Sequence, residues 1–590
     1  MKAPAAPAIG LLLAGSLCLL PFLIPYHQLP VLSFHAEWLA AALGATAALA
    51  MLFGRVWAVS LPAPALWLMG FALFLAVRAV SGGQAYPQAS LLAAIYVLYA
   101  VLMIQLGAKL VPALGVERVA VVLAAFLLAG ALANSLAGAI QFYGRPALLE
   151  DVIADLRGSR AYGNIAQANL YANYLALGEG ALLLLWLRAR VRTSYAVCAL
   201  ALLVVGGALS GSRGTLLFAL WFAALAWLVK GGQDDAEARR LKFAAYCVAA
   251  AVLAAHAAVP WLNTVLALGP GEGASDRLLR ESAEPRWLAW LLALRVFIAS
   301  PMVGVGAGEF AGAAFESGLD PSLARTGEVW TSPHNLPLHL LAETGAAGAV
   351  LALGALCVWG RQVALRYRAD RQPTLWWIVA AVGVELIHSL IEYPMWSAHF
   401  LGVTALLMGA GARLETRSPA VSRVNWIATA AACSALWVTL GITLRDYLRL
   451  DAARVSGTTV TLVPAAQAQR DAATMRELAH GLLAPVAELW IVIGAPLDRG
   501  GLAAKLEMSE RVARYWPSNA VVVRRAVFLA LGGNAEKARS LLERALQTFP
   551  YRRVVTISIL EQALAADPAA IEPLLAMARS TYDPATDPRE

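Results

Sequence analysis

Long apolar runs alternate with short connectors that carry arginine or lysine, from the start of the chain to about residue 444. Runs of about 17 to 22 apolar residues are long enough to cross a hydrocarbon core of ~30 Å as α-helices. Over all 590 residues, 60% are hydrophobic and only 14% are charged, which is typical of a multi-pass membrane protein. The sequence therefore predicts an all-α fold, a polytopic membrane helix bundle.

Thirteen apolar segments meet this length requirement. Many are rich in alanine and glycine, which lets helix backbones approach closely in lipid. The predicted spans are 8–25, 36–53, 58–79, 88–106, 118–139, 166–187, 194–210, 213–230, 241–262, 335–358, 374–391, 396–414 and 424–442.

The connectors between these spans differ in charge. With the N-terminus in the cytoplasm, basic connectors such as 188–192 and 361–371 fall on the cytoplasmic side, while 26–35, 80–87 and 392–395 on the other side have no lysine or arginine. Lysine and arginine are enriched in cytoplasmic loops. This asymmetry predicts that 140–165, the turn at 211–213, 263–334 and the chain after residue 444 face the periplasm.

After residue 444 the chain is polar, and its apolar residues recur as they do in amphipathic helices. The stretch 516–550 reads as a helix, a Gly-Gly-Asn turn and a second helix, and Trp516-Pro517 recurs as Phe549-Pro550 at a spacing of 33. This spacing is close to that of a tetratricopeptide unit. We expect two domains, 1–444 in the membrane and a periplasmic, tetratricopeptide-like domain at 445–590, which either binds protein or serves as a scaffold.

A polar cluster lies at the predicted start of the tenth span, in Trp330–Gly345. Here His334, Asn335, His339 and Glu343 fall within ten residues. A neutral imidazole accepts a proton near pH 7, which makes His334 a candidate general base. The alternative is a helix-entry histidine bonded to backbone. Helical spacing predicts that Glu343 lies roughly opposite His334.

Arginines on the expected outer side need a reason other than membrane topology. Arg213 lies in the short SGSRG turn, and Arg280 and Arg286 lie in the large loop 263–334. Guanidinium groups bind phosphate through two parallel hydrogen bonds. These three residues are therefore candidates for binding an anionic lipid headgroup, while Arg213 could also snorkel to the membrane surface.

Several polar residues fall within or beside predicted spans, where they usually face the bundle interior or a cavity. Either they form a site, or they only join helices through hydrogen bonds. They include Asn164, Gln167, Asn169, Asn173, Glu385, His388, Glu392 and Tyr393.

The sequence argues against several other classes of ligand. The net charge of +8 is explained by topology, so no nucleic-acid partner is expected. No GxxxxGK loop occurs, and GVGAGEF lacks the βαβ context of a dinucleotide site, so we expect no cofactor. The cysteines show no metal-ligand spacing. No metal is expected, although Glu150, Asp151 and Asp155 leave a divalent-metal site open.

Four motifs occur in order between residues 158 and 402: GNIAQANLYANYLALG, SGSRG, a large-loop arginine and tryptophan followed by SPMVGVGAGEF and PHN, and HSLIEYPMW with the residues after it. Together they resemble the bacterial O-antigen ligase superfamily, and within it the protein, or pilin-type, O-oligosaccharyltransferases. Ala168 and Leu170 depart from the pattern, since the family commonly has proline and histidine there. Pro337 also departs from it and predicts a slightly later start of the tenth span.

The resemblance implies a metal-independent glycosyltransferase. It would move a glycan en bloc from undecaprenyl diphosphate to a serine or threonine of a pilin or other periplasmic protein, at the inner membrane. His334 matches the essential histidine of the family, and Arg213 and Arg286 match its conserved arginines. Asn169, Gln167, Glu392, Tyr393 and Asn335 lie in further family motifs.

Three other activities remain open at this stage. The first is an O-antigen ligase that transfers the glycan to lipid A core, and the second is a polymerase that extends the lipid-linked glycan. Both would use the same arginines with a different acceptor. The third is a transporter of lipid-linked sugar, which needs polar groups along a path across the membrane. The charged candidates gather at one expected face, which argues against transport.

Overall fold

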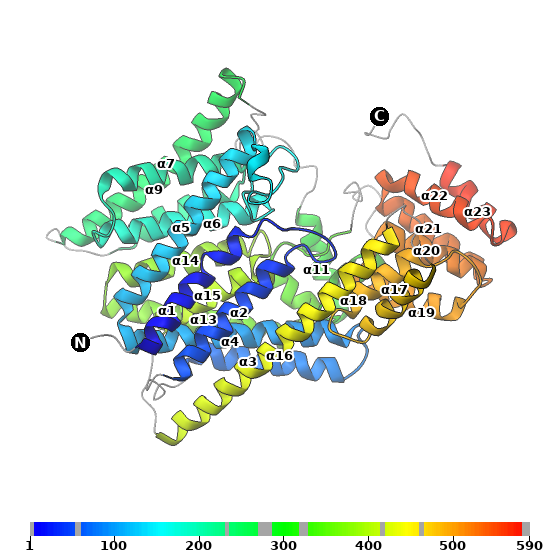
Figure 1. Cartoon of the computed structure of the whole chain (residues 1–590), viewed down its shortest axis with the longest axis horizontal. Helices are drawn as coiled ribbons and strands as arrows, with labels where there is room; N and C mark the ends of the chain where they lie inside the picture. Colours follow the sequence, from blue (N-terminus) through cyan, green and yellow to red (C-terminus); the bar gives the residue numbers. More distant parts are fainter. Residues whose placement is uncertain are drawn as a thin grey trace. The chain divides into compact units, whose positions relative to one another are not determined.

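The structure is a computed structural model of one chain. It describes residues 5–53, 61–229, 235–268, 286–317, 329–412, 419–458 and 465–580. Within these ranges every regular element is a helix and no strand occurs (Figure 1). The predicted all-α fold is confirmed.

Nine of the described helices are long and apolar enough to cross a membrane. Each coincides with a predicted span, and the chain is a multi-pass membrane protein. The nine are α1 (Ala5–Leu17) with the following 3-10 turn, α2 (Phe34–Leu52), α3 (Ala63–Val80), α4 (Pro87–Leu114), α5 (Val116–Tyr143), α6 (Ala168–Leu187), α9 (Ala236–Val265), α13 (Leu336–Ala369) and α16 (Pro419–Thr458).

The other four predicted spans correspond to apolar helices of 14 to 17 residues. At 1.5 Å per residue these helices are shorter than a typical hydrocarbon core is thick. The total of about thirteen spans therefore stays a prediction. The four are α7 (Thr193–Leu209), α8 (Gly214–Trp227), α14 (Pro373–His388) and α15 (Ala398–Gly411).

The chain forms two compact units, each built from separate stretches of sequence. The first unit comprises residues 1–70, 96–282 and 352–441, and the second comprises 71–95, 283–351 and 442–590. The C-terminal region thus shares a unit with two earlier segments, one of which contains the PHN motif.

Helix α6 lies at the centre of the first unit and is buried over almost its whole length. Its Tyr171 and Tyr174 are fully buried, as are Trp376 and Trp377 of α14. Helices α4 and α15 approach so closely that a Cβ on Gly409 would lie 2.0 Å from the carbonyl oxygen of Ile104. Small residues permit such backbone contact between helices in lipid.

Within described residues 465–580, the C-terminal region forms seven short α-helices. The predicted helix, Gly-Gly-Asn turn and helix are present as α20 and α21, packed around the buried Phe528 and Leu542. Whether they form a tetratricopeptide unit stays a prediction. The seven are α17 (Ala465–Leu478), α18 (Ala484–Gly494), α19 (Leu502–Tyr515), α20 (Asn519–Leu531), α21 (Ala535–Thr548), α22 (Arg553–Ala563) and α23 (Pro568–Ser580).

The predicted loop 263–334 contains two helices, α11 (Arg286–Ala299) and α12 (Phe310–Glu316), joined by the glycine-rich segment 300–309. This segment lies against α13 at Gly345, whose φ of 62° and ψ of −170° interrupt the helix. There the N–H groups of Ala346 and Ala347 donate to the carbonyls of Pro301 and Met302, at 2.8 and 3.1 Å.

In an unbroken helix, those two N–H groups would donate to carbonyls four residues earlier. These carbonyls also find hydrogen-bond partners in the glycine-rich segment. The carbonyls of Ala342 and Glu343 accept hydrogen bonds from the N–H groups of Val305 and Gly306, at 3.1 and 3.0 Å. Four hydrogen bonds to this segment therefore replace the i→i−4 bonds that the break removes. The break leaves no unpaired backbone groups at these positions, which buried backbone requires.

Gly304 is the residue that this contact restricts most. Its φ is 67°, and an added Cβ would lie 2.2 Å from the backbone carbon of Glu343. We expect Gly304→Ala to destabilise the protein by about 1–2 kcal/mol for the left-handed backbone and about 1–3 kcal/mol more for the clash. The measurement is the midpoint of thermal unfolding of the purified full chain in detergent.

Gly501→Ala is the matched control for this variant. Gly501 has a φ of 62°, but nothing lies within 4 Å of an added Cβ. Gly501→Ala should therefore show the backbone cost alone. Equal unfolding midpoints for the two variants would show that the backbone contact at Gly304 is not tight.

Candidate functional site

His334 lies in the turn just before α13, in the second unit. Its backbone φ is 51°, an uncommon conformation for a residue with a side chain. Its N–H donates to Ser332 Oγ at 3.1 Å, and its half-buried ring meets Trp330 edge to face at 5.5 Å between centroids. Strained backbone of this kind clusters at active sites and ligand clamps.

Asn335 forms the N-terminal cap of α13, since its Oδ1 accepts a hydrogen bond from the N–H of Leu338 at 3.1 Å. A capping asparagine satisfies one of the N–H groups that a helix start leaves unbonded. The helix begins at Leu336, with Pro337 in its first turn, where proline is tolerated. The helix therefore begins one residue after the predicted start of the tenth span at residue 335.

Glu343 was predicted to lie roughly opposite His334 by counting helical turns between them, and this count does not hold. His334 precedes α13 and has a left-handed backbone, so helical spacing cannot be counted from it. Within the helix, His339 Nε2 lies 3.0 Å from Glu343 Oε2, one turn away. Glu343 Oε1 also accepts hydrogen bonds from the N–H groups of Gly308 and Phe310, at 2.9 and 3.3 Å. Glu343 therefore fastens the glycine-rich segment to the helix behind the PHN turn.

Glu309, in the same segment, joins it to the C-terminal region. Its carboxylate accepts hydrogen bonds from the N–H of Ala85 and from Arg514 Nη2, both at 2.6 Å. Burial raises the pKa of Glu309, and the Ala85 N–H and the Arg514 guanidinium oppose that shift. Glu488 of α18 adds a second link by accepting a hydrogen bond from Tyr86 at 2.6 Å.

A second polar cluster, in the first unit, centres on Asn169 in the first turn of α6. Asn169 Oδ1 accepts hydrogen bonds from Arg160 Nη2 at 2.8 Å and from Ser212 Oγ at 2.9 Å. Asn169 Nδ2 donates to Glu392 Oε1 at 2.7 Å, and Arg160 Nε donates to the Ser210 carbonyl at 2.6 Å. Three predicted motifs, GNIAQAN, SGSRG and EYP, therefore meet at one side chain.

The other predicted residues of the first unit lie around this cluster. Arg213 follows Ser212 directly, is half-buried and lies at the N-cap position of α8, just before Gly214. Gln167 caps α6, because its Oε1 accepts a hydrogen bond from the N–H of Leu170 at 2.5 Å. The Tyr393 ring packs against Trp396, with 5.3 Å between ring centroids.

The remaining predicted arginines, Arg280 and Arg286, belong to the predicted loop 263–334. Arg286 is half-buried at the start of α11, in the second unit. Arg280 lies outside the described residues.

Arg160 was not among the predicted site residues, yet it binds Asn169 and the SGSRG turn. The signal in the sequence was an arginine in an expected outer loop, where insertion topology does not call for positive charge. That signal was shared by Arg145 and Arg157, and the sequence alone could not separate the three.

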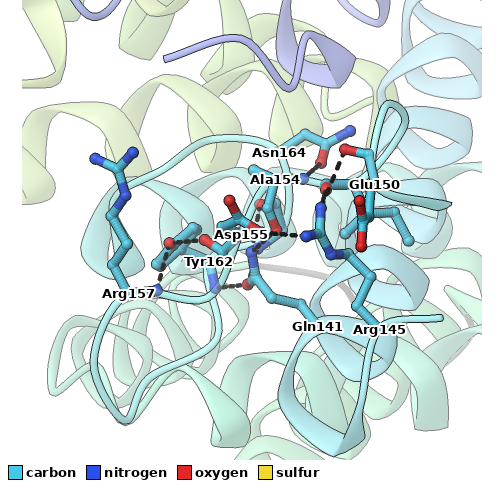
Figure 2. A network of polar contacts seen from close by, with 10 residues as sticks. Gln141, Arg145, Glu150, Ala154, Asp155, Arg157, Tyr162 and Asn164 are labelled. Atoms are coloured by element: carbon cyan, nitrogen blue, oxygen red, sulfur yellow. Dashed lines mark hydrogen bonds and ion pairs between the residues drawn. The ribbon is translucent and has the colours of Figure 1, made fainter. Parts of the chain in front are cut away.

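The loop after α5 is tied down by side-chain bonds to its own backbone (Figure 2). The side-chain amide of Gln141 forms hydrogen bonds of 2.7 to 3.2 Å with backbone atoms of Tyr162, Gly163 and Ala154. Arg145 forms an ion pair with Asp155 and also donates to the carbonyl of Ile153 at 2.6 Å. Burial raises the pKa of Tyr162, whose hydroxyl donates to the carbonyl of Asp155. These hydrogen bonds and the ion pair hold the loop in a fixed conformation.

This loop borders a cavity of about 690 Å³ that lies entirely in the first unit. The connection between α1 and α2 forms another side, and Arg160, Gln167 and Tyr393 line it too. The volume falls within the range of small-molecule sites, about 300–1,000 Å³. We refer to it as the first-unit chamber.

A smaller cavity of about 280 Å³ lies within the second unit. Val329 and Thr331, just before the PHN motif, line it together with Trp516, Asn519 and Phe549 of the C-terminal region. It is called the second-unit cavity below.

The O-antigen ligase family matches residues 198–353, and the C-terminal part of the virulence factor membrane-bound polymerases matches residues 376–557. A General O-oligosaccharyltransferase of Acinetobacter baylyi is 28% identical over 405 residues, which cover 68% of this chain and 69% of that protein. The chain is similar to members of the O-antigen ligase superfamily.

Within the O-antigen ligase superfamily, this chain is similar to the O-oligosaccharyltransferases, and its activity is of the ligase or oligosaccharyltransferase type. The ligase match contains Arg213, Arg286 and His334, while the polymerase match contains Glu392 and most of the C-terminal region. Asn169 and Arg160 lie outside both matches. Their connection to the matched SGSRG turn is evident only from the structure.

Asn169→Ala should destabilise the protein, because Arg160, Ser212 and Glu392 each lose a hydrogen-bond partner. Loss of a partner by a buried polar group costs about 1–3 kcal/mol. The measurement is the thermal unfolding midpoint in detergent, with Asn534→Ala as the control, since Asn534 is exposed and its side chain makes no cap hydrogen bond. An unchanged midpoint for Asn169→Ala would refute the role of this cluster as a junction.

Proposed function

We propose that this protein transfers an oligosaccharide en bloc from undecaprenyl diphosphate to a serine or threonine hydroxyl of an acceptor protein. The observation that carries the proposal is the PHN turn. An imidazole is held there in a strained backbone conformation against Trp330, in a segment matched by the O-antigen ligase family. A positioned, half-buried histidine is suited to general-base catalysis near neutral pH.

In the proposed reaction, the acceptor oxygen attacks the anomeric carbon while the bond from that carbon to the diphosphate oxygen breaks. The hydroxyl proton passes to His334, and the carrier leaves as its diphosphate anion. Arg213 and Arg286 offset the charge that develops on the diphosphate, a task that preorganised cations perform well. With guanidinium groups in this role, the step does not require a metal ion. Arg280 is proposed as a further phosphate contact.

Two observations favour a protein as acceptor. The relative from Acinetobacter baylyi is named an O-oligosaccharyltransferase. The second-unit cavity is lined both by residues next to the PHN motif and by residues of the C-terminal region, including the exposed Trp516. An acceptor segment bound there would lie beside Val329 and Thr331, which precede His334 by five and three positions in the chain. A pilin is one such acceptor.

Polymerisation of the glycan is the second candidate, because the family that matches residues 376–557 is named for a membrane-bound polymerase. Transfer to lipid A core is the corresponding activity of an O-antigen ligase. Both differ from the first proposal in the acceptor alone. In all three cases we place the reaction on the periplasmic side of the inner membrane.

His334→Ala should abolish transfer, because the attacking hydroxyl loses its base. The measurement is the intact mass of a candidate pilin co-expressed with the protein and a lipid-linked glycan pathway, after membrane levels have been matched. His480→Ala is the control, since His480 is an exposed histidine of the C-terminal region. Full glycan addition by His334→Ala would eliminate this role, and a change in lipopolysaccharide without a mass gain on pilin would favour lipid A core as acceptor.

Trp516→Ala should reduce transfer to protein by about tenfold or more, because buried aromatic anchors dominate peptide binding. Hydrolysis of the lipid-linked donor should be unaffected. Tyr551→Ala is the control, since Tyr551 is 44% exposed in the same region and does not line the second-unit cavity. Unchanged transfer at limiting acceptor concentration would contradict a role for this cavity in acceptor binding.

A further inference from the structure

The first-unit chamber is a built cavity with a polar lining that the proposed reaction does not yet use. Its wall is the loop shown in Figure 2, which is fixed by the bonds of Gln141 and Arg145. Because this wall is preorganised, a bound ligand would not need to order it, which lowers the free-energy cost of binding.

The chamber adjoins the Asn169 cluster. Arg160 lines the chamber and also binds Asn169, whose other partner Ser212 precedes Arg213 in the chain. A molecule with its diphosphate at Arg213 could therefore extend its other end into the chamber. In the proposed donor, the group attached to the diphosphate is the glycan.

The charges of the chamber distinguish between an anion and a sugar. An anion site would show an excess of positive charge. The charged lining residues are instead three arginines and three acids, so the formal charges cancel: Arg145, Arg157 and Arg160 against Glu150, Asp151 and Asp155.

Charged and neutral polar side chains can both form hydrogen bonds with hydroxyl groups, so this lining suits a hydroxyl-rich ligand. Arg157 makes no side-chain hydrogen bond or ion pair within the described residues, and Figure 2 shows its guanidinium pointing away from the other labelled side chains. Tyr26 lines the chamber and is 53% exposed, so its ring is available to pack against a sugar face.

His399 gives an independent indication of a ligand. It lines the chamber and is only 6% exposed, yet its Nδ1 has no hydrogen-bond partner in the part of the chain that the structure describes. Buried polar atoms are nearly always hydrogen-bonded, and an exception calls for an explanation. A sugar hydroxyl can donate to such a nitrogen or accept from it, depending on the tautomer.

We propose that the first-unit chamber binds the sugars of the donor nearest the diphosphate and prefers uncharged glycans to strongly acidic ones. This inference rests on the proposed function for the identity of the donor. Arg157, Tyr26 and His399 are the residues that contact the sugar. With about 690 Å³, the chamber has room for a short saccharide rather than the whole chain of a long glycan.

The test measures binding directly, so that it does not depend on transfer. The purified full chain in detergent is titrated with a neutral trisaccharide and with its uronic-acid analogue, and saturation-transfer NMR reports the bound fraction. We expect the neutral sugar to bind more tightly. Tyr26→Ala and Leu32→Trp should each weaken its binding by about tenfold, the first by removing a ring and the second by filling the chamber.

Both substitutions are made at exposed positions, so folding should be preserved. Tyr195→Ala is the control, since Tyr195 is 65% exposed and lies outside the chamber. Wild-type binding in both chamber variants, or tighter binding of the acidic analogue, would overturn the proposal. Displacement of the bound uronic-acid analogue by inorganic pyrophosphate, but not by the neutral trisaccharide, would identify an anion site. That result would also overturn the proposal.

His334→Ala separates this inference from the proposed function. The substitution should abolish transfer and leave trisaccharide binding unchanged, because His334 does not line the chamber. If the wild-type protein binds the neutral trisaccharide but transfers no glycan, the proposed function is wrong and the chamber remains a sugar site. If it transfers glycan but the chamber variants bind normally, the chamber inference is wrong and the proposed function stands.

Discussion

The exchange of backbone hydrogen bonds at Gly345 is the constraint on which the PHN turn depends. A helix broken in its interior leaves N–H and carbonyl groups that need partners, and here residues 301–306 supply all four. This exchange brings Gly304 against the backbone of Glu343, and the Glu343 side chain then binds the next turn of the same segment. The glycine-rich segment is therefore part of the support for His334.

The same segment gives the C-terminal region its position within the second unit. Glu309 binds Arg514, and Gly308 and Gly312 are small enough for α19 to pack directly on them. In the first unit, the corresponding junction is Asn169, which joins Arg160, Ser212 and Glu392. Each unit thus positions its own candidate residues through one polar side chain with several partners, the buried Glu343 in the second unit and the half-buried Asn169 in the first. Such networks define a single arrangement when every member is bonded.

Much of the helical architecture could be predicted from local sequence. Apolar runs and their charged connectors located every long helix, because burial in lipid requires a continuous apolar stretch. The helix ends were less well predicted, since α4, α13 and α16 continue past the predicted spans to Leu114, Ala369 and Thr458. The Gly-Gly-Asn turn between α20 and α21 was also readable, since glycine tolerates the left-handed backbone there. The relation of His334 to Glu343 was not, because a regular helix was assumed across a position with φ of 51°. The importance of Arg160 was likewise missed, since its partners lie 9 and 50 residues away along the chain.

By itself, the sequence determined the class of fold, the succession of apolar helices and the motifs that the family resemblance uses. These depend on composition and on spacing within one segment, which need no knowledge of distant contacts. Only the tertiary structure decided that residues 301–306 complete the broken helix α13, that Asn169 joins three motifs, and that a charge-balanced chamber lies beside it. Those features arise from hydrogen bonds and packing between segments far apart in sequence, and no local pattern encodes which distant group will be the partner.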